Sequence, residues 1–202
     1  MLKRAFCSSF FLFLLPVLFL NYGMPNTTVF FQIEPGSKLY IKGTSNVTDF
    51  TCKCEELFPR LQMTIIPKSA KAAFEKTTLS IGAKKLDCGN KAMNKDMYET
   101  LKADDFPTIQ IALLESEARN LGEDWINLSV SANITIAGIT RQEKFSVQAR
   151  RAEELQYRFK ASKTLKMTDY GMTPPRPMFG LIKVKDEIIL ELDLNISVLE
   201  KI

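Results

Sequence analysis

The chain has 202 residues, of which 46% are hydrophobic and 25% are charged, as expected for one globular domain with an ordinary core. Its formal net charge is +4, and Lys3 and Arg4 supply part of it. The rest of the chain is therefore nearly neutral and has no electrostatic basis for binding nucleic acid. The sequence contains no histidine, which removes Ser-His-Asp and Cys-His catalysis and histidine-ligated metal sites. It also contains no GxGxxG, P-loop or GxSxG motif.

The first segment is typical of a secretory signal. Its basic start is followed by an apolar run at residues 10–20 and then by small and polar residues. An uncleaved anchor is the weaker alternative, because the run is short and contains Pro16. We therefore predict a signal peptide over residues 1–23, a mature domain over residues 24–202 and a periplasmic location.

Short apolar or alternating runs predict the early strands, at residues 29–33, 37–45, 60–67 and 72–87. The sequence TCKC ends a further strand, on which Cys52 and Cys54 share a face. Loss of Cys7 with the signal leaves these two cysteines and Cys88, so either of the two can pair with Cys88. A thiolate metal site is the weaker alternative, because the chain offers no fourth soft ligand.

One helix interrupts the strands. Asn90 is a plausible N-cap, and Met93, Met97 and Leu101 follow at helical spacing on one face. Pro107 ends the segment.

Alternation is clearest in the later strands, which we predict at residues 108–119, 124–140, 143–153, 155–167 and 181–199. In residues 126–136 the even-numbered side chains are apolar, and the odd-numbered ones are Asn, Ser or Thr. Because a single helix cannot cover so much apolar sheet, we expect the sheet to curl into an antiparallel barrel. An outer-membrane barrel with its apolar face outward is the weaker alternative, since aromatic girdles are missing.

A proline-rich loop precedes the last strand, with three prolines in the four residues 174–177. Proline cannot donate to a sheet, so no interior strand runs through this loop. Its apolar residues Tyr170, Met172, Met178 and Phe179 predict that the loop closes one end of the barrel or lines its mouth. The alternative is a rigid connection with a few core anchors.

Three segments resemble, in this order, motifs of the YceI-like family of exported bacterial proteins: LKADDFPTIQIAL at residues 101–113, ITIAGITRQEKFSV at 134–147, and residues 163–194. The resemblance spans about residues 33–199.

Two further segments, SNVTDFTC and LDCGNKAMNKDMYETL, resemble a subgroup of that family with a cysteine in each place. The resemblance thus favours a disulfide between Cys52 and Cys88. The chain departs from many relatives in lacking a histidine near Thr48 and Asp49, and in carrying Cys54.

The resemblance implies an all-β fold, an eight-stranded antiparallel lipocalin-like barrel with one short helix between early strands. It also implies an apolar tunnel for an isoprenoid-like lipid such as a polyisoprenoid quinone, and no other cofactor. A barrel filled by its own side chains is the alternative that the residues alone leave open. The expected ligand contacts are Leu128, Val130, Ile134, Ile136, Phe145, Val147, Phe159, Met172, Phe179, Leu192 and Leu194.

Two functions are compatible with a barrel that contains an apolar tunnel. The first is a periplasmic carrier of the lipid, without catalytic or metal-binding residues. It would bind no nucleic acid, and a homodimer or a transient membrane contact would be compatible with it. The second is an isomerase or cyclase acting on an apolar substrate, for which the only candidate groups are Tyr157, Tyr170, Glu115 and Asp169.

Overall fold

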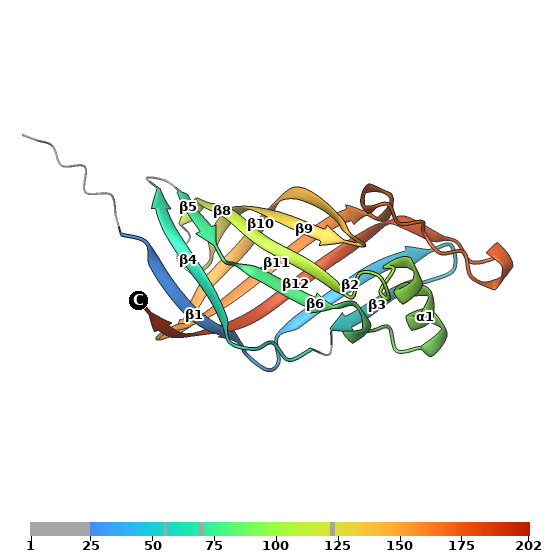
Figure 1. Ribbon diagram of the computed structural model, residues 1–202, viewed down its shortest axis with the longest axis horizontal. Coiled ribbons are helices and arrows are strands. Elements are labelled where there is room, and N and C mark those ends of the chain that lie inside the picture. The colour runs from blue at the N-terminus through green and yellow to red at the C-terminus, as the bar shows by residue number, and fades with distance from the viewer. Residues whose placement is uncertain (1–24, 55, 69–70, 122–123) are drawn as a thin grey trace, which may run out of the picture.

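The computed structural model describes residues 25–54, 56–68, 71–121 and 124–202 (Figure 1). The predicted signal peptide lies outside these residues. The elements are β1 (Thr27–Ile33), β2 (Lys38–Ser45), β3 (Asp49–Cys54), β4 (Leu61–Lys68), β5 (Lys71–Glu75), β6 (Thr78–Gly82), β7 (Leu86–Asp87), α1 (Lys91–Thr100), β8 (Thr108–Leu121), β9 (Ile126–Ile136), β10 (Ile139–Glu153), β11 (Gln156–Lys166) and β12 (Val184–Lys201), with short 3-10 turns at Ala83–Lys85, Met167–Tyr170 and Met178–Gly180.

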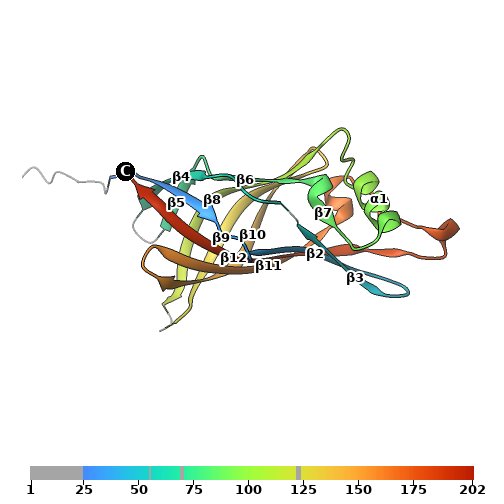
Figure 2. The ribbon, with the colours of Figure 1, turned by 90° about the horizontal axis from the view of Figure 1, so that it is seen from below.

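The strands form one antiparallel sheet that closes on itself. Its hydrogen-bonded order runs β1-β4-β5-β8-β9-β10-β11-β12, and β12 pairs back with β1. Closure leaves no open edge along this ring of eight strands and places the apolar strand faces inside. The predicted eight-stranded lipocalin-like barrel is confirmed (Figures 1 and 2).

Two walls of the barrel are long strands broken by a bend. β1 and β2 both pair with β12, with Ile33 opposite Ile196 and Lys38 opposite Asp193. Pro35 and Gly36, the latter at φ +86°, interrupt pairing between them. β5 and β6 likewise share β8 as partner, and between them Lys76 adopts a left-handed conformation with φ 56°.

The single strand predicted at residues 72–87 is therefore wrong in part. The structure divides it into β5, β6, a 3-10 turn and β7. Thr77 stabilises the first break, because its hydroxyl donates a hydrogen bond of 2.9 Å to the Leu113 carbonyl. Nothing in the residue types of Lys76 and Thr77 signals that break.

The strand predicted at residues 124–140 is in fact two strands and a tight turn. Ile136 pairs with Ile139, and the two residues between them, Ala137 and Gly138, have φ values of 48° and 78°. Such a turn matches the twist of the strands that it joins. Glycine suits residue 138 because its φ of 78° is strained for other residues, and a Cβ there would also displace the Phe106 ring.

The predicted helix and its N-cap are confirmed, but α1 ends at Thr100, before Pro107, and a turn in which Lys102 has φ 51° follows. The Asn90 Oδ1 accepts hydrogen bonds from the backbone N–H groups of Ala92 and Met93, at 2.8 and 3.3 Å. α1 lies at one end of the barrel, beside the β2–β3 hairpin (Figure 2). Within the described residues, no helix has the length and apolar character needed to cross a membrane.

A disulfide joins Cys52 to Cys88, as the resemblance implied. It ties β3 to the segment that leads into α1. Cys54, the other pairing partner considered, lies outside this disulfide.

Most of the buried core lies in the half of the barrel next to α1. Its core combines inward side chains of β6, β8, β9 and β12 with the loop residues Met167, Tyr170 and Met172. Ile134 and Tyr170 are fully buried there. Among the described residues, this layer of buried side chains lies between the barrel walls at the α1 end.

Candidate functional site: an apolar cavity in the barrel

The other half of the barrel is hollow. A cavity of about 370 Å³ lies between its walls, away from α1, and seven of the eleven predicted contact residues line it. These are Leu128, Val130, Phe145, Val147, Phe159, Leu192 and Leu194.

Strand register brings these side chains together. Leu128 on β9 pairs with Val147 on β10, Val147 pairs with Ala161 on β11, and Ala161 pairs with Leu192 on β12. Directly paired residues point to the same face of a sheet. The four side chains therefore form one continuous row across the cavity wall, and the period-2 pattern repeats such rows along the barrel.

The lining is chemically uniform. Its polar side chains are few: Gln62, Thr77, Thr78, Ser116, Tyr157 and Lys201, the last at the exposed end of β12. Among the described residues that line this cavity there is no carboxylate. Such a surface favours a hydrocarbon chain, which gains free energy from burial and needs few polar partners.

The remaining four predicted contacts lie elsewhere. Ile134 and Ile136 belong to the packed layer next to α1. Met172 is buried and lines a second cavity, described below. Phe179 lines neither cavity and is fully exposed.

Sequence reasoning also missed part of the site. Val29, Phe31 and Ile33, alternate residues of β1, line the cavity, as do Met63, Ile65 and Phe74 on β4 and β5. The alternation in β1 could have identified its three residues. In β4 the residues Ile65 and Ile66 are both apolar, so the sequence pattern does not tell which of them faces inward.

A second apolar cavity, of about 380 Å³, lies at the α1 end of the barrel. It is enclosed by the β2–β3 hairpin, α1 and the proline-rich loop. Five methionines contribute to its lining: Met93 and Met97 of α1, and Met167, Met172 and Met178 of the segment that follows β11. Methionine side chains are flexible and polarizable, so they adapt to irregular apolar surfaces.

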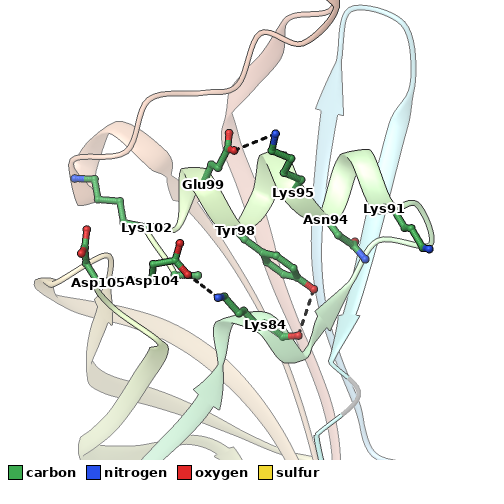
Figure 3. A pocket seen from close by; sticks show the side chains of 10 residues that line it. Lys84, Lys91, Asn94, Lys95, Tyr98, Glu99, Lys102, Asp104 and Asp105 are labelled. Atoms are coloured by element: carbon green, nitrogen blue, oxygen red, sulfur yellow. Dashed lines mark hydrogen bonds and ion pairs between the residues drawn. The ribbon is translucent and has the colours of Figure 1, made fainter.

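A third hollow lies on the outer surface of α1 and is open and charged (Figure 3). Its charged groups largely neutralise one another. Lys84 contacts Asp104 at 2.6 Å, and Lys95 contacts Glu99 at 3.7 Å. The Tyr98 hydroxyl donates to the carbonyls of Lys84 and Leu86, which anchors α1 to the sheet (Figure 3). This hollow therefore has the character of an ordinary solvated helix face.

The four candidate catalytic groups are dispersed. Tyr157 lines the barrel cavity, whereas Glu115 forms an ion pair with Lys71 at 3.3 Å and does not line it. Asp169 is exposed, and its backbone carbonyl accepts a hydrogen bond from Arg141. Burial raises the pKa of Tyr170 to about 12, which makes its phenol a weaker acid than that of an exposed tyrosine. Across the described ranges, no cluster of three or more Cys, Asp and Glu residues could hold a metal ion.

One ion pair reinforces the cavity wall from outside. Arg158 on β11 binds Asp193 on β12 through two hydrogen bonds of 2.7 Å. These bonds lower the pKa of the Asp193 carboxyl and raise that of the Arg158 guanidinium. The pair holds together the two strands that carry Phe159 and Leu194.

An eight-stranded antiparallel barrel with an apolar internal cavity defines a lipocalin-like protein. The sequence profile of the YceI-like domain matches residues 29–196, and the chain belongs to that family. No curated protein matches the chain in sequence.

Solved structures share the fold. BcnA of Burkholderia cenocepacia is 15% identical with a TM-score of 0.61, and the match covers 81% of this chain and 99% of that one. A polyisoprenoid binding domain from Saccharophagus degradans, described as implicated in plant cell wall breakdown, is 13% identical with a TM-score of 0.63. That match covers 85% of this chain and 99% of that one.

Proposed function

We propose that the chain is an exported carrier that holds an isoprenoid-like lipid, such as a polyisoprenoid quinone, in the barrel cavity. The observation that carries this proposal is the continuous apolar lining built by paired residues of β9 to β12. Burial of a hydrocarbon chain there contributes about 25 cal/mol per Å² of apolar surface removed from water. The fold shared with the polyisoprenoid binding domain from Saccharophagus degradans supports the same class of ligand.

An isomerase or cyclase on the same fold is the alternative. Such an enzyme would need an acid or a base beside its substrate. The described lining of the barrel cavity includes the phenol of Tyr157 and the amine of Lys201, without a carboxylate. This composition supports carriage rather than catalysis, and we assign no catalytic residue and no further cofactor.

The proposal includes a periplasmic location after removal of residues 1–23. Membership of the YceI-like family and the Cys52–Cys88 disulfide both support an oxidising compartment.

Native mass spectrometry of the protein isolated from a bacterial periplasm tests this function. The full chain is expressed with its own first 23 residues and purified without detergent. We expect an adduct that organic solvent releases and whose mass matches a polyisoprenoid. A protein that carries no adduct, or that carries only a water-soluble metabolite, would contradict the proposal.

A further inference from the structure

The proline-rich loop projects beyond α1 at one end of the molecule, and the β2–β3 turn lies at the same end (Figures 1 and 2). Asn46 joins them. Its Nδ2–H donates to the Leu181 carbonyl at 3.0 Å, and its Oδ1 accepts from the Lys183 N–H at 2.7 Å. We call residues 46–48 and 174–183 together the apolar tip.

Four large apolar side chains of the apolar tip are exposed to solvent. The exposed fraction is 65% for Val47, 63% for Met178, 108% for Phe179 and 73% for Leu181. Single exposed apolar residues are ordinary on protein surfaces, but a group of them at a projecting end indicates a contact surface.

The backbone of the apolar tip fixes this exposure. Met178 and Phe179 both have φ 54°, a left-handed conformation that L residues rarely adopt. Two hydrogen bonds close the turn, from the Leu181 N–H to the Met178 carbonyl at 3.1 Å and from the Ile182 N–H to the Pro177 carbonyl at 3.3 Å. Residues in a disfavoured conformation that serves no core packing point to a function outside the fold.

The charges of the apolar tip have one sign. Arg176 and Lys183 are its only charged residues, and both are exposed. The nearest carboxylate along the hairpin is Asp49, just beyond the apolar tip. Apolar side chains flanked by cations suit the interface of an anionic bilayer, where the cations meet lipid phosphates.

The shape of the apolar tip favours a bilayer over a protein partner. A stable protein interface buries about 800 Å² on each side, which a narrow projection of four apolar side chains does not offer. A bilayer needs no complementary surface, because a projecting aromatic ring can enter it directly.

We propose that the apolar tip inserts into the interface of a bilayer that contains anionic phospholipid. In this arrangement Phe179 enters the lipid, and Arg176 and Lys183 contact the headgroups. The second cavity, whose lining includes Val47 and Met178, then lies against the bilayer. This proposal does not depend on the lipid in the barrel cavity, because that cavity lies in the opposite half of the barrel.

Sedimentation with vesicles of phosphatidylcholine and phosphatidylglycerol tests the proposal. We expect the mature protein to sediment with these vesicles, and Phe179→Ser combined with Leu181→Ser to weaken binding about tenfold or more. Arg176→Glu combined with Lys183→Glu should weaken binding to the same vesicles by a similar factor. The matched control is Leu57→Ser, an 83% exposed leucine outside the apolar tip, which should bind like the wild type.

Fluorescence shows whether the apolar tip itself enters the lipid. Trp125 is the single tryptophan, so Trp125→Phe provides a silent background. In that background Phe179→Trp should shift its emission to the blue when vesicles are added, and Leu57→Trp should not.

Three results would each overturn the proposal. These are absence of vesicle binding by the wild type, equal binding by the Phe179→Ser/Leu181→Ser variant, and an unshifted emission of Phe179→Trp. If the folded wild type does not bind vesicles, a protein partner becomes the alternative occupant of this surface.

Discussion

Ile134 and Asn133 are neighbours on β9, yet their surroundings are opposite. The Ile134 side chain is fully buried in the packed layer next to α1, whereas Asn133 is half-buried on the outer face. An unpaired carboxylate at Ile134 would be removed from water without a partner, at a cost of several kcal/mol. We therefore expect Ile134→Asp to unfold the domain or to lower its free energy of unfolding by about 3 kcal/mol or more.

Urea denaturation of Ile134→Asp beside Asn133→Asp measures this difference. The second variant places the same carboxylate one residue away, where it faces outward, and should stay within about 0.5 kcal/mol of the wild type. Equal losses of unfolding free energy at the two positions would contradict this assignment of the faces of β9.

Asp186 makes the base of the proline-rich loop sensitive to acid. Its carboxylate accepts hydrogen bonds from the Thr168 N–H at 2.9 Å and from the Thr168 hydroxyl at 2.6 Å. These bonds lower the pKa of Asp186 from its ordinary value of 3.8. A lowered folded-state pKa means that the stabilisation is complete above 3.8 and is lost as the pH falls through the folded-state value.

Melting curves of Asp186→Asn as a function of pH check this expectation. The variant should melt below the wild type at pH 7, by a few degrees, and the difference should shrink below about pH 4. The control is Asp169→Asn. Asp169 lies in the turn that contains Thr168, but its carboxylate forms neither of these hydrogen bonds. A difference between Asp186→Asn and the wild type that stays constant down to pH 2 would exclude the Asp186 carboxylate as the cause.

The disulfide ties the β2–β3 hairpin to the segment that leads into α1. Cys52 and Cys88 are separated by 36 residues in sequence. A cross-link of this loop length stabilises a fold by about 2–4 kcal/mol, largely by restricting the unfolded chain. Reduction should lower the urea midpoint accordingly, whereas Cys52→Ser combined with Cys88→Ser should show the lower midpoint with or without reductant. Identical midpoints of the oxidised and reduced wild type would contradict this assignment.

The proline-rich loop is buried at Met172 and exposed at Phe179. Met172 is buried against the barrel core, so Met172→Ala should lower the free energy of unfolding by about 2–4 kcal/mol. Phe179 contacts no core, so Phe179→Ala should change it by less than about 0.5 kcal/mol. Chemical denaturation of both variants measures the contrast. A larger loss at Phe179 than at Met172 would show that the loop is held by its other end.

Some of these elements could be predicted from sequence and others could not. The faces of β9, β10 and β12 follow from their period of two, and the start of α1 follows from Asn90. The break at Lys76 could not be predicted, because lysine gives no signal of a left-handed conformation. The exposure of Phe179 could not be predicted either, because it depends on the hydrogen bonds of one turn.

Along its axis, the barrel has most of its buried core at the α1 end and a large apolar cavity in the other half. Alternation tells which face of a strand points inward, but not how far along the barrel axis a residue lies. Ile134 and Val130 therefore look alike in sequence, although one is in the packed layer and the other lines the cavity. The difference arises because Tyr170, Met167 and Met172 fill only the end next to α1.

Two variants of β11 test whether an isoprenoid chain occupies the hollow half. Ala161 lines the cavity, whereas Ser162, the next residue, is exposed on the outer face. Ala161→Trp should fill the cavity without overpacking a solid core, and Ser162→Trp should add the same side chain outside. The measurement is the equilibrium binding of a long-chain isoprenoid quinone to the delipidated wild type and to both variants. We predict equal affinity for the wild type and Ser162→Trp, and affinity at least about tenfold lower for a folded Ala161→Trp. Undiminished binding by Ala161→Trp, or no binding by the wild type, would contradict the assignment of this cavity.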